Sequence, residues 1–144
     1  MSCSTRGDAE LFVVDASITL AWCFDDELTT ATERALERLA LEGGIAPAHW
    51  PLEVANGLRF AASSGRVDVA SITRAREIVR QLPVEIRPVE TPTALSLIEP
   101  ARQHDLTVHD AAYLGLAEAL GLGVATLDQR LAAACRTVGV PLIT

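Results

Sequence analysis

Four acidic residues of this 144-residue chain lie where a strand would end and a helix would begin. Asp15 follows the apolar run "LFVV", Glu53 lies in "WPLEVAN", Asp110 in "TVHDAAYLGLA" and Asp128 in "VATLDQRL". A single acid at such a junction is commonly a helix cap, or a charge that opposes the helix dipole. Because these acids occur at four separate junctions, their combination favours one shared site over four independent caps.

Carboxylates gathered in one crevice repel each other. Two unit charges ~4 Å apart interact by about 1 kcal/mol in water and by about 4 kcal/mol at an effective dielectric constant near 20. Raised pKa values or a bound cation relieve that repulsion. Because most of these carboxylates have no histidine or cysteine beside them, they suit Mg²⁺ or Mn²⁺ better than zinc. Such an ion activates a water and neutralises the charge of a phosphodiester, so these residues point to metal-assisted phosphodiester hydrolysis.

The segments that must position these acids alternate between short apolar runs and helical periodicities. The predicted strands are 10–16, 44–48, 84–89, 123–127 and 141–144, and the predicted helices are 17–24, 29–41, 50–65, 68–82, 91–105, 109–123 and 128–139. Pro100 is expected to kink the helix that contains it. This alternation predicts an α/β fold of three layers, α/β/α, with a mostly parallel central sheet. Ligands bind at the carboxyl edge of such sheets, where Asp15, Glu53 and Asp128 would lie.

Composition predicts one domain over residues 10–144, preceded by a flexible leader at 1–9. The chain is 49% hydrophobic, which argues against disorder, and it contains no apolar run near 20 residues. We therefore expect no membrane contact and a cytoplasmic location. A net charge of −7 argues against a general binder of polyanions. It is compatible with an acidic metal site whose rim carries arginines, and the candidates for that rim are Arg59, Arg66, Arg74, Arg76 and Arg80.

The motifs "VVDAS", "PLEVAN", "HDAAYLGLA" and "ATLDQRL", in that order, resemble those of PIN-domain ribonucleases, and most of all VapC-type toxins of bacterial type II toxin–antitoxin pairs. The resemblance covers residues 11–144. It implies that the first and fourth strands are neighbours. It also implies that the four acids hold one or two Mg²⁺ or Mn²⁺ ions and that the chain cleaves RNA internally. Two partners are implied as well, a second copy in a homodimer and a small VapB-type antitoxin encoded beside the toxin.

Each acid is assigned a role in that hypothesis. Asp15 and Asp110 are predicted as direct metal ligands, and a helix cap is the alternative role for each. Asp128 would bind a second ion or orient the attacking water, and Glu53, which is longer, would act through a water. Four nearby polar residues are predicted to orient the acids or to contact RNA: Ser17, Asn56, Thr126 and Arg130.

Other functions remain as alternatives. A receiver-like signalling domain with Asp15 as phosphoacceptor would need paired acids and a lysine late in the chain, and this chain has no lysine. A phosphatase of the haloacid-dehalogenase type would need a second aspartate at the position of Ser17. The alternative kept here is a catalytically silent PIN fold, or a receiver-like domain, that acts only by binding.

Overall fold

The computed structural model describes residues 10–143, and the alternation of strands and helices follows the sequence prediction. In chain order the elements are β1 (Phe12–Val14), α1 (Ala16–Cys23), a 3₁₀ helix (Asp25–Glu27), α2 (Thr30–Glu42), β2 (Gly44–Pro47), α3 (Trp50–Ser63), α4 (Val69–Gln81), β3 (Val84–Arg87), α5 (Thr91–Ser96), α6 (Ile98–His104), α7 (Val108–Leu120), β4 (Val124–Ala125) and α8 (Gln129–Val138). Within residues 10–143, no helix is long and apolar enough to cross a membrane.

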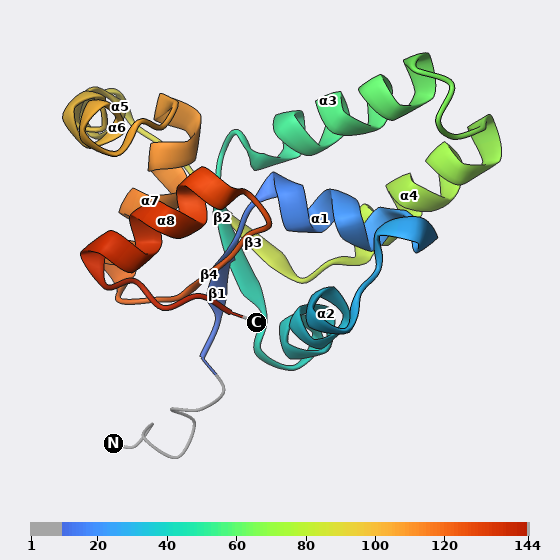
Figure 1. Ribbon diagram of the computed structural model, residues 1–144, viewed down its shortest axis with the longest axis horizontal. Helices are drawn as coiled ribbons and strands as arrows, with labels where there is room; N and C mark the ends of the chain where they lie inside the picture. Colours follow the sequence, from blue (N-terminus) through green and yellow to red (C-terminus); the bar gives the residue numbers. More distant parts are fainter. Residues whose placement is uncertain (1–9, 144) are drawn as a thin grey trace.

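Four parallel strands form the central sheet, in the order β3-β2-β1-β4 (Figure 1). The strand nearest the beginning of the chain is therefore paired with the last strand, and Val13 lies opposite Val124. This pairing confirms the expected neighbourhood of the first and fourth strands. The apolar run of β1 is buried throughout, as a strand covered on both faces requires.

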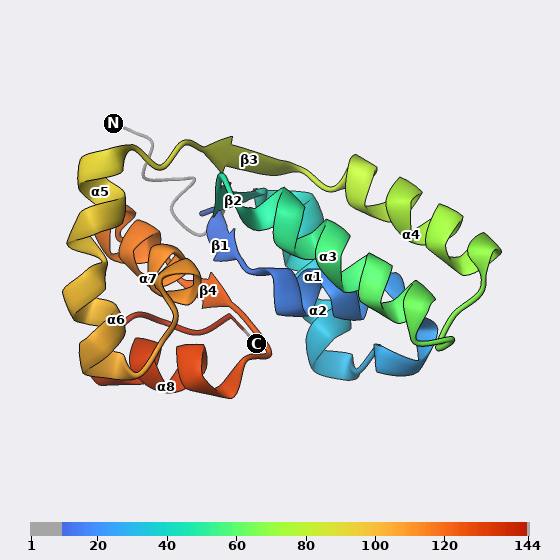
Figure 2. The same cartoon turned by 90° about the horizontal axis from the view of Figure 1, so that it is seen from above.

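Helices cover both faces of the sheet, which confirms the three-layer α/β/α fold (Figure 2). Side chains alternate along β1, so that Val13 packs into one hydrophobic cluster with residues of α3, α7 and α8. Phe12 and Val14 point to the other face and pack against α1 and α2. The sheet thus fixes the start of α1 relative to the helices that follow the other strands.

A close approach of α1 and α3 brings the beginnings of these two helices together. Gly57 makes the approach possible, because a Cβ at this position would lie 2.4 Å from Cδ1 of Leu20. Helix α4 continues from α3 as an antiparallel partner, and the pair extends away from the sheet (Figure 2).

The kink predicted at Pro100 is wrong, because the break lies earlier in the segment. The segment forms two helices, α5 and α6, which are separated at Leu97. Pro100 is the third residue of α6, where the missing N–H would have no partner within the helix anyway. Leu97 is 8% exposed and packs against Ala101 and Ala111, so burial of this leucine accompanies the break. Of the strand predicted at 141–144, the described residues 141–143 form an isolated parallel bridge between Leu142 and Val124 in place of a full strand.

Candidate active site

Asp15 lies directly after β1 and is 4% exposed. Its carboxylate accepts hydrogen bonds from the backbone N–H of Ile18 at 3.1 Å and from the hydroxyl of Ser17 at 2.7 and 2.9 Å. The hydroxyl of Thr126 also donates to it. Asp15 is therefore the helix cap of α1, which was the alternative to its predicted role as a metal ligand. The cap role uses part of its acceptor capacity and holds the carboxylate at the carboxyl edge of the sheet.

Two hydroxyl groups connect Asp15 to the end of β4. The Ser17 hydroxyl accepts from the backbone N–H of Leu127 at 2.8 Å, and the Thr126 hydroxyl accepts from the N–H of Asp128 at 2.9 Å. Asp128 in turn caps α8 by accepting from the N–H of Leu131 at 2.9 Å. The predicted placement of Ser17 and Thr126 beside the acids is thus observed as direct contact.

Asp110 is in the first turn of α7, but it does not cap this helix. Thr107 is the cap, and its side chain accepts from the N–H of Asp110 at 3.1 Å. The cap role considered for Asp110 is therefore wrong, and its half-buried carboxylate is not committed to α7 in this way.

Glu53 comes from the first turn of α3, which follows β2. Its Oε1 atom accepts a hydrogen bond from the hydroxyl of Tyr113 at 2.7 Å. His49 precedes α3, and its Nε2 atom lies 3.9 Å from the same Oε1.

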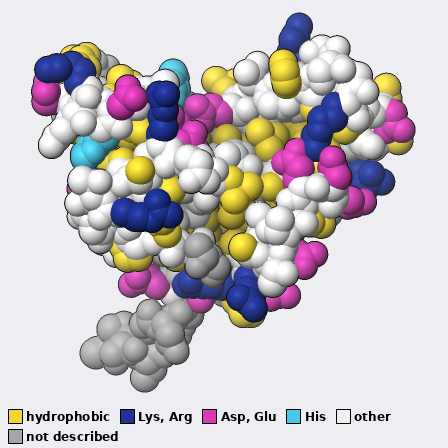
Figure 3. Space-filling view, viewed as in Figure 1, with side chains coloured by type: hydrophobic (Ala, Val, Ile, Leu, Met, Phe, Trp, Pro, Cys, Tyr) yellow, Lys and Arg dark blue, Asp and Glu magenta, His cyan; other side chains and the backbone are white. Residues whose placement is uncertain are grey.

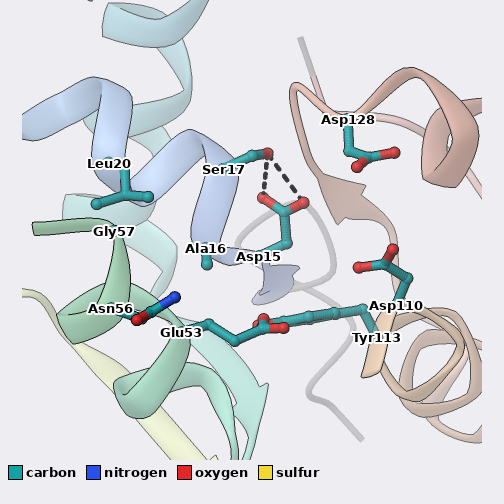
Figure 4. A pocket seen from close by; sticks show the side chains of 10 residues that line it. All are labelled: Asp15, Ala16, Ser17, Leu20, Glu53, Asn56, Gly57, Asp110, Tyr113 and Asp128. Carbon is teal, nitrogen blue, oxygen red and sulfur yellow. Dashed lines mark hydrogen bonds between the residues drawn. The ribbon is translucent and has the colours of Figure 1, made fainter. Parts of the chain in front are cut away.

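The four acids line one open hollow of about 330 Å³ at the carboxyl edge of the sheet. Within the described residues, every charged side chain that lines the hollow is a carboxylate. In the space-filling view, acidic side chains gather between the half with α7 and α8 and the half with α1 and α3 (Figure 3). Figure 4 shows how the acids surround this space from different elements. The residues that line it are Asp15, Ala16, Ser17, Leu20, Glu53, Asn56, Gly57, Asp110, Tyr113 and Asp128.

The acids influence each other's protonation. Burial, as the main cause, and the charge of Asp128 raise the pKa of Asp15 to about 6, although hydrogen bonds from Thr126, Ile18 and Ser17 act in the opposite direction. Burial also raises the pKa of Asp110, and the charges of Asp128 and Glu53 add to that increase. The repulsion predicted from the sequence therefore operates between side chains from four different elements.

Comparison with known proteins decides the family. The model of the PIN domain family matches residues 12–137. The chain belongs to the PIN domain family. It is 35% identical over 139 residues to Ribonuclease VapC3 of Mycobacterium tuberculosis, which covers 93% of this chain and 94% of the relative. It is 34% identical over 123 residues to VapC ribonuclease Mb0985 of Mycobacterium bovis, covering 84% and 88%. These relatives make the chain a VapC-type PIN domain.

A solved structure supports the same fold. The PIN domain described here superimposes on the crystal structure of PAE2754 from Pyrobaculum aerophilum with a TM-score of 0.69 and 24% identity. The match covers 94% of this chain and 85% of the other. The two chains therefore share a fold at low sequence identity.

The residues of this PIN domain fit a hard divalent cation by their chemistry. The hollow offers carboxylates from four elements, and the hydroxyl of Ser17 lies beside them. Oxygen ligands of this kind suit Mg²⁺ or Mn²⁺. Among residues 10–143, however, no three His, Cys, Asp or Glu side chains are already grouped at distances that would hold a metal ion. A cation held by these carboxylates would therefore require them to lie closer together than they do in this structure.

Two other predicted residues differ in their relation to the hollow. Asn56 lines it from α3, one helical turn after Glu53, as their spacing indicates. Arg130 does not line it, and its Nη1 atom lies 3.5 Å from Oδ2 of Asp105, with both side chains largely exposed.

Arg66, which was expected at a basic rim, has acidic partners elsewhere. Its Nη2 atom lies 3.0 Å from Oδ1 of Asp26 and 2.5 Å from Oε2 of Glu27. The guanidinium also lies over the ring of Phe24, 4.5 Å from its centroid. These contacts anchor the 3₁₀ helix after α1, so we assign Arg66 a structural role.

Tyr113 is the site residue that sequence reasoning missed. It lies three residues after Asp110, which places both on one face of α7, and it is the only tyrosine of the chain. Burial, followed by the hydrogen bond to Glu53, raises the pKa of Tyr113 above its ordinary value. Its spacing from Asp110 indicated that Tyr113 would lie on the same face of α7 as that acid, but it did not indicate the hydrogen bond to Glu53 of α3.

Proposed function

We propose that this chain is a Mg²⁺- or Mn²⁺-dependent endoribonuclease and the toxin of a type II toxin–antitoxin pair. The observation that carries the proposal is the single hollow lined by Asp15, Glu53, Asp110 and Asp128, from four separate elements. The names of the relatives support RNA as the substrate, because they are ribonucleases of the VapC type. Hydrolysis of a phosphodiester is the reaction that such a set of carboxylates suits best.

Each side chain has a task in this proposal. Asp15 and Asp110 hold the cation, with Asp128 beside them. Glu53 acts through a water, and Asp128 orients the water that attacks. When bound, the cation neutralises charge on the scissile phosphate and lowers the pKa of a water molecule. The hydroxyls of Ser17 and Thr126 keep the Asp15 carboxylate oriented before the cation arrives, because both donate to it.

The proposal is tested by incubating the purified chain with RNA in Mn²⁺ or Mg²⁺, and again after addition of a chelator. Wild-type protein should cut RNA internally in the presence of the ion and should stop when the chelator removes it. Asp110→Asn should lower the cleavage rate by at least ~100-fold, because it removes a charged ligand without removing a helix cap.

Asp105→Asn is the matched control for this variant. Asp105 is an acid of the same region, its side chain is 88% exposed, and asparagine tolerates its left-handed backbone. This variant should cleave as fast as wild type. Cleavage that persists after chelation, or equal rates for wild type and Asp110→Asn, would contradict the proposed function. A wild-type protein that binds RNA without cutting it would favour the catalytically silent alternative.

The proposed partners are a second copy of the chain and a small VapB-type antitoxin. Light scattering on the purified protein should give twice the chain mass of 15.3 kDa. Co-expression with the short reading frame beside its gene should yield a stable complex without ribonuclease activity. A mass of one chain argues against the dimer, and a neighbouring product that neither binds nor inhibits argues against the toxin–antitoxin assignment.

A further inference from the structure

The hydroxyl of Tyr113 and the carboxylate of Glu53 form a link between α7 and α3 across the floor of the hollow. The hydroxyl donates to Oε1 of Glu53 at 2.7 Å, and the two residues are 60 positions apart in the chain. The tyrosine is 1% exposed and packs in the hydrophobic core, so its position is set by the fold. Figure 4 shows the hydroxyl end of Tyr113 at the carboxylate of Glu53.

An aromatic contact with His49 also holds Tyr113 from the side. The ring of His49 lies 5.0 Å from that of Tyr113, at an interplanar angle of 67°. His49 is itself held, because its Nε2 atom lies 3.0 Å from the backbone oxygen of His109. The donor that meets Glu53 therefore belongs to a packed group of rings contributed by both sides of the hollow.

Within residues 10–143, the Tyr113 hydroxyl is the one hydrogen-bond donor to the Glu53 side chain, since Nε2 of His49 lies 3.9 Å from Oε1. The side chain of Glu53 is 32% exposed and has three rotatable bonds, so water competes for both carboxylate oxygens. Tyr113 occupies Oε1, and within residues 10–143 no hydrogen bond involves Oε2. The hydrogen bond thus divides the carboxylate into one oxygen that is fixed by the protein and one that remains available to a ligand.

We infer that Tyr113 is a positioning residue of the metal centre, which fixes Oε1 of Glu53 so that Oε2 alone serves the cation or a water attached to it. The inference rests on the proposed function, because it requires a divalent ion in the hollow. Partners that orient a ligand from outside the coordination sphere commonly change metal affinity by about 10- to 100-fold when they are removed. Tyr113→Phe removes the hydroxyl alone and keeps the buried ring.

Calorimetric titration with Mn²⁺ tests the inference through a double-mutant cycle. Tyr113→Phe should weaken Mn²⁺ binding by about 10-fold. The same change in a Glu53→Ala background should weaken binding no further, because the hydroxyl acts only through Glu53. Thr32→Val is the matched control, since it deletes another buried hydroxyl, in α2 and outside the hollow, and it should leave Mn²⁺ affinity unchanged.

A spectroscopic measurement keeps the test decisive if Tyr113→Phe does not fold. Because the chain has one tyrosine, protein labelled with ¹³C-tyrosine gives ring signals from Tyr113 alone. Titration with Mg²⁺ should shift these signals in a saturable way, and Glu53→Ala should reduce the shift.

The outcomes separate the two proposals. Wild-type protein that binds no Mn²⁺ overturns the proposed function and this inference with it. Equal Mn²⁺ affinities of the wild-type protein and Tyr113→Phe overturn this inference and leave the proposed function intact. The inference is also overturned if Tyr113→Phe weakens Mn²⁺ binding equally in the wild-type and Glu53→Ala backgrounds, because the hydroxyl would then not act through Glu53. A tyrosine signal that does not shift with Mg²⁺ overturns it as well.

Discussion

Thr126 donates its hydroxyl hydrogen to the carboxylate of Asp15, although 111 positions separate the two residues in the chain. The same hydroxyl oxygen accepts the backbone N–H of Asp128 at 2.9 Å. One threonine at the end of β4 therefore connects two of the four acids. The pairing of β4 with β1 makes the connection possible, since Ala125 lies opposite Val14.

Thr126→Val should destabilise the protein, because it leaves the N–H of Asp128 without its acceptor and Asp15 without one of its donors. We expect the free energy of unfolding to fall by about 1–3 kcal/mol. The pKa of Asp15 should rise further, since the hydrogen bond from Thr126 lowers it. Urea denaturation measures the first effect. Thr137→Val, which removes an exposed hydroxyl from α8, should change stability by less than about 0.5 kcal/mol.

Asp15→Asn should remove a pH dependence of folding in metal-free buffer. The pKa of Asp15 is about 6 in the folded protein and 3.8 ordinarily, so between these values the folded state holds a proton that the unfolded chain has lost. The stability of wild type should therefore fall as pH rises through this window, by up to about 3 kcal/mol. Urea denaturation at about pH 4 and about pH 7.5 measures the change.

The asparagine variant should show a shallower decline over that window and should be the more stable protein at the higher pH. Asp105→Asn serves as the comparison, because its exposed side chain lies outside the hollow. Equal pH profiles for wild type and Asp15→Asn would show that Asp15 is not buried as described.

Arg66→Ala should reduce the stability of the protein and leave its affinity for RNA unchanged. The variant loses the ion pairs to Asp26 and Glu27 and the contact over the ring of Phe24. Because these groups are partly exposed, we expect a loss of about 1 kcal/mol that shrinks at high salt. Thermal denaturation at two salt concentrations measures it. A weaker affinity for RNA at unchanged stability would instead support the basic rim predicted from the sequence.

Gly44→Ala should be costly, because the start of β2 leaves no room for a methyl group. A Cβ there would lie 2.6 Å from Cδ1 of Leu39 and 2.7 Å from Cγ2 of Val14. Overpacking of this kind typically costs about 1–3 kcal/mol. Val14→Ala should cost less in the Gly44→Ala background than in wild type, as denaturation of the four proteins would reveal. Additive losses would argue against the steric contact.

Local patterns in the sequence were enough to predict the layers of the fold and the junctions at which the acids lie. The apolar run before Asp15 indicates a strand buried on both faces, and the glycines and prolines near helix ends indicate where helices stop. These signals depend on a few neighbouring residues. They do not depend on how the helices pack, so they survive without any knowledge of the tertiary structure.

Features that depend on tertiary contacts were not predictable in this way. The break at Leu97 accompanies burial of this leucine, whereas the sequence drew attention to Pro100. The hydrogen bond between Tyr113 and Glu53 depends on how α7 and α3 pack against each other, and the sequence of neither helix determines that packing alone. Asp110 lacked a cap role because Thr107 was available three residues earlier.

The pairing of β1 with β4 also has a consequence for protein synthesis. A ribosome adds about 5–20 residues per second, and the N-terminal half of the chain emerges from it first. Asp15 is therefore made long before Thr126 and Asp128, which must be translated before they can dock beside it. Every shorter nascent chain lacks part of the carboxylate hollow. Premature termination anywhere before Asp128 should thus yield fragments without the full set of carboxylates, and the complete pocket can form only after Asp128 has been translated.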